Sequence, residues 1–258
     1  MYFHIYLYTL FTFISNAKKK IFYLNMRLQF LDIIRAISFI LMFIFHIFVT
    51  INIFKSNYYD LKNPIINNIG FIARNLFILL FGISLYLSYI SSNNIIDYKK
   101  KQFNRINILL ICSIIITTIT YIFIPDKYIV FGILHFFSIS TIILYNFVNN
   151  IPVLLIILLF ILFYNNYISI SYSKKTYPIG MFIPYYKSTI DHFHIFKYLP
   201  ILIIGILLGH IIHRINKKYN LSKYKFKNKI LEFIGQNTLL LYMLHIPILY
   251  ILVRLFLY

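Results

Sequence analysis

The chain has 258 residues, of which 60% are apolar and only 12% are charged. Soluble domains average about 45–50% apolar and about 25% charged residues, so this composition excludes a water-soluble globular fold. It also excludes a disordered chain, because disorder requires low hydrophobicity. The sequence therefore predicts an all-α polytopic membrane protein, a helix bundle in the lipid bilayer with about seven spans of about 20 residues each.

The net charge of +19 raises the question of a nucleic-acid partner. The chain is rich in Ile, Asn, Lys, Tyr and Phe and has no Trp, a bias that makes Lys the default loop residue. We therefore expect no nucleic-acid partner. The single cysteine, Cys112, lies in an apolar run, which excludes a disulfide within the chain and a cysteine metal site.

Apolar runs between charge clusters predict the spans. They lie at 33–54, 65–91, 104–124, 129–149, 151–165, 197–213 and 237–257. An eighth apolar run at 2–16 is short for a span, so eight spans remain an alternative. Residues 1–25 form either an N-terminal apolar segment with a basic stretch or an extension upstream of a start at Met26. Residues 26–258 are expected to form one domain.

The distribution of Lys and Arg predicts the orientation. Fifteen of these residues lie in or beside one set of loops, which includes 92–103 and 214–230, and seven lie in the opposite set. We therefore expect the loops 92–103 and 214–230 to be cytoplasmic. The loop 166–196 and the C-terminus are expected on the extracytoplasmic side.

Ionisable residues inside spans are costly, so each one is a candidate for function. In the first span, Arg35 and His46 are eleven residues apart, which places both on one helix face about 16 Å apart along the axis. Arg35 would lie near the cytoplasmic interface and His46 in the outer half. In the alternative, structural interpretation, Arg35 reaches the headgroups and pairs with Asp32.

Two further candidates lie towards the outer side. His135 is expected at a depth close to that of His46, so the two histidines could line one cavity, or His135 could be a structural hydrogen-bonding residue. Arg74 can hold an anionic or carbonyl group, or it can join helices.

The last span begins after Gly235, where Asn237 or Thr238 can cap the helix, and it carries His245 and Pro247 mid-membrane. We treat Asn237 and His245 as structural residues or members of a site. Histidines also occur in pairs at 192 and 194 and at 210 and 213. The second pair has no carboxylate or third His nearby in the sequence. The first pair lies beside Asp191, where a surface metal site is a weak alternative, and overall we expect no metal.

Several motifs occur together in one order. They are Arg27-Leu28-x-Phe30-Leu31-Asp32-x-x-Arg35-Ala36, the run through Leu41-Met42 to His46, Phe77 to Gly82-Ile83-Ser84, Arg105 before an apolar span, Phe131-Gly132-Ile133-Leu134-His135, Gly205 to Gly209, and Gly235-Gln236-Asn237-Thr238-Leu239 with Tyr242 to His245 and Pro247. Over about residues 27–257 this order resembles the short bacterial-type members of the heparan-alpha-glucosaminide N-acetyltransferase catalytic-domain family, formerly a domain of unknown function. The Arg35–His46 spacing also fits the wider transmembrane acyltransferase group, including the acyltransferase-3 family.

The resemblance implies an integral-membrane acyltransferase that moves an acetyl group from cytoplasmic acetyl-CoA to an extracytoplasmic sugar amine or hydroxyl. It implies that Arg35, paired with Asp32, binds the CoA phosphates and that His46 is the general base or a transient acyl carrier. Arg74 would polarise the acyl carbonyl. The family usually has Gly where this chain has Ala36, and lysosomal members place the proposed histidine in the first external loop. No His occurs here between 47 and 134, so His46 or His135 must supply the chemistry.

Two alternatives remain open at this stage. One is an acyltransferase-3-like O-acetylase of surface glycans. The other is a non-catalytic membrane carrier or scaffold whose buried polar groups line a path or join helices, although the sequence has no inverted repeat of the kind common in carriers. The expected partners are the lipid bilayer and a small-molecule or glycan acceptor, and a homo-oligomer is left open.

Overall fold

A computed structural model describes residues 28–55, 58–123, 125, 128–167, 181–182, 191–221 and 228–257. The expectations for residues 1–25, and for most of the loop 166–196, lie outside this described part of the chain. In the described part the regular structure is helical, apart from a single bridge between Phe131 and His192. The helices are α2 (Gln29–Phe54), α3 (Pro64–Ile90), α4 (Ile95–Phe123), α5 (Ile133–Leu144), α6 (Ile151–Tyr167), α7 (Ile195–Tyr219), α8 (Lys229–Gln236) and α9 (Thr238–Leu257).

Each of the seven predicted spans coincides with a helix, and five of these helices are long and apolar enough to cross a membrane. The five are α2, α3, α4, α7 and α9. The other two apolar helices are shorter: α5 has 12 residues and α6 has 17. A 12-residue helix is about 18 Å long, well below the roughly 30 Å of a bilayer core. The described structure is therefore consistent with the predicted all-helical membrane fold, and the number of spans stays a prediction.

The two basic stretches predicted as loops are partly helical, and the loop boundaries of 92–103 and 214–230 are wrong in this respect. The first turns of α4 already contain Lys101, which pairs with Asp97 one turn earlier at 2.9 Å. At the second stretch α7 continues to Tyr219, and its C-cap residue Asn220 has a left-handed backbone with a φ of 51°. Lys is a good helix former, so a basic segment can extend a helix beyond its apolar part.

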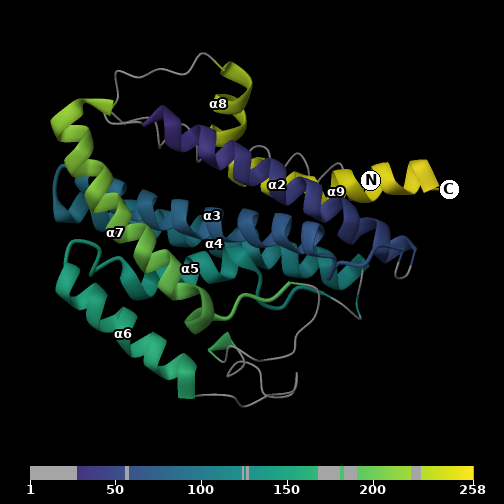
Figure 1. Ribbon diagram of the computed structural model, residues 1–258, viewed down its shortest axis with the longest axis horizontal. Helices are drawn as coiled ribbons and strands as arrows, with labels where there is room; N and C mark the ends of the chain where they lie inside the picture. The colour runs from purple at the N-terminus through teal and green to yellow at the C-terminus, as the bar shows by residue number, and fades with distance from the viewer. Residues whose placement is uncertain are drawn as a thin grey trace.

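Helices α3 and α7 pack against each other across the bundle (Figure 1), and glycines lie where they meet. A Cβ atom added at Gly82 would lie 2.2 Å from the carbonyl oxygen of Leu202, and one at Gly205 would lie 2.3 Å from that of Leu79. Small residues of this kind allow two helix backbones to approach closely in a membrane. The glycines at 82 and 205 are therefore required by the packing.

The start of α7 contains Pro200, which has no N–H to donate to the carbonyl of Phe196 four residues earlier. Asn165 of α6 replaces this donor, because its side-chain Nδ2 donates to the Phe196 oxygen at 2.7 Å. The contact fixes α6 to the first turn of α7.

One side of α6 carries large apolar side chains that no other described residue covers. Their exposed fractions lie between 43% and 66%, and they are Leu155, Ile156, Leu159, Phe160, Leu162 and Phe163. A soluble protein rarely exposes such a patch. Contact with lipid chains accounts for it, which agrees with an integral membrane protein.

Candidate functional site

Polar side chains gather at two levels of the bundle. The first level, which we call the Arg35 end, lies where α2 begins and α3 ends. There the Arg35 guanidinium forms an ion pair with Asp32 and donates to the hydroxyl of Ser84 on α3 at 2.6 Å. Ser84 in turn donates to the carbonyl of Leu80 at 2.7 Å. The predicted pair of Arg35 and Asp32 therefore exists, and it is tied to a second helix.

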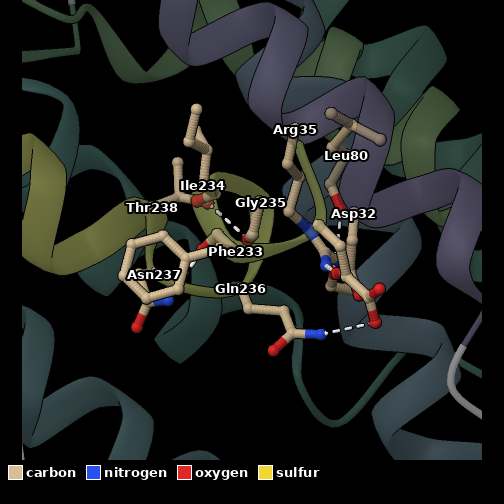
Figure 2. A network of polar contacts seen from close by, with 11 residues as sticks. Asp32, Arg35, Leu80, Phe233, Ile234, Gly235, Gln236, Asn237 and Thr238 are labelled. Atoms are coloured by element: carbon tan, nitrogen blue, oxygen red, sulfur yellow. Dashed lines mark hydrogen bonds and ion pairs between the residues drawn. The ribbon is translucent and has the colours of Figure 1, made fainter. Parts of the chain in front are cut away.

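The short helix α8 covers this ion pair from the other side (Figure 2). Gly235 lies so close to α2 that an added Cβ would be 1.9 Å from the carbonyl oxygen of Asp32. A hydrogen bond of 2.9 Å between Gln29 and Glu232 holds the two helices together nearby. The glycine of the Gly-Gln-Asn-Thr motif is thus explained by helix contact rather than by a turn alone.

The sequence predicts Asn237 or Thr238 as the cap at the start of the last span, and the structure places both at the break between α8 and α9. Their side chains point backwards: Asn237 donates to the carbonyl of Phe233 at 2.7 Å, and Thr238 donates to that of Gly235 at 2.6 Å. Both therefore satisfy carbonyl groups at the end of α8. The expected bond to the first N–H groups of α9 is not formed by them, because these side chains can also bond to the preceding turn.

A second guanidinium, that of Arg105 on α4, lies at the Arg35 end. It is close enough to Arg35 for the two charges to repel each other, and its Cζ atom is 5.7 Å from the ring centre of Phe81. Its nearest polar partner is the Gln102 oxygen at 3.2 Å, which is neutral. Two cations near one carboxylate, Asp32, leave this part of the bundle with an excess of positive charge.

Two serines on one face of α3, and a third two residues beyond its end, accompany these cations. Ser84, Ser88 and Ser92 are four residues apart, so their hydroxyl groups follow one face towards the end of the helix. Ser88 accepts from the amide of Gln102 at 3.0 Å, and Ser92 accepts from Lys101 at 3.2 Å. The result is a polar strip from Arg35 to the basic start of α4.

The second level is built around His46 of α2, which lies beside His245 of α9. Their ring centres are 4.9 Å apart and the rings are nearly perpendicular, at 85°. The Nδ1 of His46 is 2.8 Å from the carbonyl of Met42, and that of His245 contacts the carbonyl of Tyr242. Because a carbonyl only accepts, each Nδ1 carries the proton, and each Nε2 keeps a lone pair. The Nε2 of His245 is buried and has no hydrogen-bond partner among the described residues.

His135 makes no ring contact with His46 or His245 among the described residues, and a cavity that both His46 and His135 line stays a prediction. His135 lies in the first turn of α5, where its Nδ1 accepts from the backbone N–H of Gly132 at 3.3 Å. Its Nε2 is 3.4 Å from the hydroxyl of Thr117 on α4. These contacts cap α5 and join it to α4, which favours the structural alternative for His135.

Arg74 lies at the end of the bundle opposite the Arg35 end, on α3. Its guanidinium is 5.1 Å from the ring centre of Tyr198 on α7, and its Nε is buried with no acceptor among the described residues. The neighbouring Asn75 also has a buried side-chain oxygen without a donor in that set. Unpaired buried polar atoms are rare in folded proteins, so the surroundings of Arg74 resemble a binding site more than a packed core.

Asp191, which sequence reasoning did not single out, lies beside Arg74. It precedes α7 in a short segment outside the helices, and its charge interacts with that of Arg74. Burial raises the pKa of Asp191 to about 6, and the positive charge of Arg74 limits the rise. The sequence signal that could have found it is the scarcity of acidic residues, since only six occur in the chain.

The other histidine pairs do not form metal centres in the described residues, where no group of three or more His, Cys, Asp or Glu side chains has a suitable arrangement. His210 stacks on Tyr86 at 3.6 Å between ring centres, and its Nε2 donates to the carbonyl of Val148 at 2.8 Å. His192 and His194 lie with their ring centres 4.6 Å apart. His210 therefore has a packing role between α7, α3 and the turn after α5.

Comparison with known proteins adds one finding to this geometry. Residues 27–247 match a protein-family model described as heparan-alpha-glucosaminide N-acetyltransferase, catalytic. No curated protein and no solved structure matches the chain.

Proposed function

Since the chain belongs to the heparan-alpha-glucosaminide N-acetyltransferase catalytic family, a family of membrane acetyltransferases, we propose that it moves an acetyl group from cytoplasmic acetyl-CoA to a sugar amine or hydroxyl on the opposite side of the membrane. The observation that carries the proposal is the position of two polar sites on one helix. Arg35 and His46 lie on the same helix α2, eleven residues apart, and each contacts a different neighbouring helix.

The orientation follows from charge. The Arg35 end lies beside the basic start of α4 and the basic end of α7, and basic loops favour the cytoplasmic side. In this orientation the acyl donor approaches the Arg35 end from the cytoplasm. Arg74 and Asp191 then lie on the extracytoplasmic side.

At the Arg35 end, the two guanidinium groups of Arg35 and Arg105 would bind the phosphate groups of the donor. Guanidinium is suited to this task because its donors match phosphate oxygens in pairs. The hydroxyl group of Ser88, whose oxygen accepts from Gln102, adds a neutral donor along the same strip. Asp32 holds Arg35 in place and offsets part of its charge.

Between the two levels, α2 presents apolar side chains. Phe39 and Met42 follow Arg35 at four and seven residues, on the face that also carries His46, and both pack with Ala73 of α3. An apolar interval excludes water from the thioester, which protects it from hydrolysis. The interval of about 16 Å suits an extended pantetheine arm.

In the transfer step, a lone pair on the acceptor nitrogen or oxygen forms a bond to the acetyl carbonyl carbon, and the carbon–sulfur bond of the thioester breaks. The Nε2 of His46 takes the proton that the acceptor loses, and the CoA thiolate leaves. Arg74 polarises the carbonyl oxygen, on which negative charge develops.

The test is binding of acetyl-CoA to the detergent-purified protein, measured by calorimetry for wild type and Arg35→Ala. We expect saturable binding by wild type and a loss of at least about tenfold in affinity for the variant. Arg254→Ala is the matched control, because Arg254 is an exposed arginine at the far end of α9. If folded wild type does not bind acetyl-CoA, or if both variants bind it equally well, the donor site is wrong, and a carrier or scaffold becomes the better interpretation.

A further inference from the structure

The acidic side chains of the described residues differ in one respect. Asp32 pairs with Arg35, Asp97 pairs with Lys101, Asp60 accepts from the backbone N–H of residue 62, and Glu232 accepts from two glutamines. Asp191 is the exception, since no described residue donates a hydrogen bond to it. A largely buried carboxylate without donors is costly, so a ligand that supplies donors would stabilise it.

The position of Asp191 is fixed by contacts of the neighbouring backbone. The next residue, His192, forms the bridge to Phe131, and the backbone N–H of Phe193 donates to the carbonyl of Phe131 at 2.9 Å. A Cβ added at Gly132 would be 3.3 Å from the Asp191 Oδ2. The N-cap of α5, Gly132, therefore packs against the carboxylate of Asp191.

Charged and titratable groups reach Asp191 from three helices. Arg74 of α3, Tyr198 of α7 and Tyr242 of α9 each interact electrostatically with it, and Lys197 of α7 faces Arg74. Arg74 gives partial compensation of charge but no hydrogen bond to the carboxylate. A carboxylate that interacts with two tyrosines and a guanidinium is well suited to a polyhydroxylated ligand, which offers both apolar and hydrogen-bonding faces.

Tyr242 connects Asp191 to the histidine pair. Its ring centre is 5.0 Å from that of His245, which is 4.9 Å from that of His46. Asp191 therefore interacts electrostatically with a tyrosine whose ring lies beside the histidine pair. A ligand held by Asp191 would be near the reacting end of the acyl donor.

We propose that Asp191 is an acceptor-binding residue, whose carboxylate accepts hydrogen bonds from the hydroxyl or amine groups of a sugar. The proposal rests on the proposed function, and it assigns the acceptor side of the same site. A carboxylate offers about four lone-pair positions, so it can accept from two neighbouring groups on one sugar ring. Arg74 remains directed at the acetyl carbonyl, and Asp191 orients the group that attacks it.

The experiment compares wild type, Asp191→Asn and the control Asp60→Asn, an exposed carboxylate on the same expected side. Glucosamine, glucose and a simple non-sugar amine serve as acceptors. For Asp191→Asn we expect the acceptor KM for the two sugars to rise about 10- to 100-fold, while acetyl-CoA affinity stays within twofold of wild type. The non-sugar amine should lose much less, and Asp60→Asn should behave as wild type.

An unchanged sugar KM in Asp191→Asn would overturn the proposal. So would an equal loss of acetyl-CoA affinity, because that indicates a structural role. Binding of glucosamine without donor, followed by thermal shift, separates this inference from the proposed function. If wild type transfers no acetyl group but binds glucosamine in a manner that Asp191→Asn weakens, the proposed function fails and the Asp191 site stands. If wild type transfers acetyl and Asp191→Asn binds glucosamine as well as wild type does, the proposed function stands and the Asp191 site is wrong.

Discussion

His46 and His245 come from helices α2 and α9, almost 200 residues apart in the chain, and their rings meet edge to face with centres 4.9 Å apart. Each ring uses its Nδ1 to bond the backbone of its own helix. Each Nε2 is then free to accept a proton. Two imidazoles in the same tautomer, side by side in an apolar bundle, form a base with a second acceptor behind it.

Replacing His46 by Ala should reduce acetyl transfer by at least about 100-fold, because general base catalysis contributes factors of about 10²–10⁴. Acetyl-CoA binding should be retained, since Arg35 is about 16 Å away along the helix. The measurement is the rate of transfer to a sugar acceptor, beside calorimetry of donor binding. His213→Ala is the control, as His213 lies at the far end of α7. Transfer at the wild-type rate by His46→Ala would contradict the assigned role.

Replacing Arg105 by Gln should weaken binding of acetyl-CoA about tenfold, because one of two guanidiniums facing the phosphates is lost. The affinity for S-acetylpantetheine, which has no phosphate, should not change. A salt titration gives a second readout, since a phosphate contact weakens as ionic strength rises. If both ligands lose affinity equally, Arg105 acts through packing, and the phosphate assignment is wrong. Measurement in lipid nanodiscs as well as detergent shows whether a lipid headgroup competes for the same charge.

Replacing Gly235 by Ala should lower the free energy of unfolding by about 1–3 kcal/mol. The new methyl group would meet the backbone of Asp32, so α8 would have to shift away from α2. The check is thermal unfolding in detergent. Gly70→Ala is the matched control, since an added Cβ there meets only the ring of Phe45, a side chain that can rotate away. Equal melting temperatures for the two variants would show that α8 is loosely attached to α2.

The stability of the protein should depend on pH through Asp191. Its folded-state pKa is about 6, against a usual value of 3.8, so between these values the folded protein holds a proton that the unfolded chain has released. The contribution of Asp191 to stability therefore falls as pH rises from about 4 to about 6. Arg74 limits this effect, because its positive charge favours the ionised carboxylate. The difference in melting temperature between wild type and Asp191→Asn, measured across this window, isolates the effect. A difference that does not vary with pH would contradict it.

Much of the fold follows from the sequence, because lipid leaves helices as the only regular structure for an apolar chain. Every predicted span became a helix, and the pairing of Asp32 with Arg35 followed from their spacing. The length of α5 did not follow, since the apolar run 129–149 includes residues that form the bridge and the turn on either side of the helix. Hydropathy predicts which residues can lie in lipid, but it does not predict at which residue a helix ends.

The site was predictable only within single helices. Periodicity placed Arg35 and His46 on one face, but it could not show that the partner of His46 is His245 rather than His135, because that choice depends on helix packing. Arg105 and Asp191 became candidates for the same reason. A guanidinium at a helix start and a carboxylate in a loop look ordinary until their neighbours are known, and a contact between distant segments has no local signal.

The glycine contacts between α3 and α7 have a mechanical consequence. The backbones touch at Gly82 and Gly205, so sliding one helix along the other would bring larger side chains against the facing backbone. We therefore expect the two helices to move together. Arg74 and Ser84 belong to α3, whereas Arg35 and His46 belong to α2. The close contacts of Gly82 and Gly205 join α3 to α7 and do not involve α2. We therefore expect relative motion to occur mainly between α2 and α3. The proposed path of the acetyl group runs along this same interface, past Arg35 and His46 on one side and Arg74 on the other.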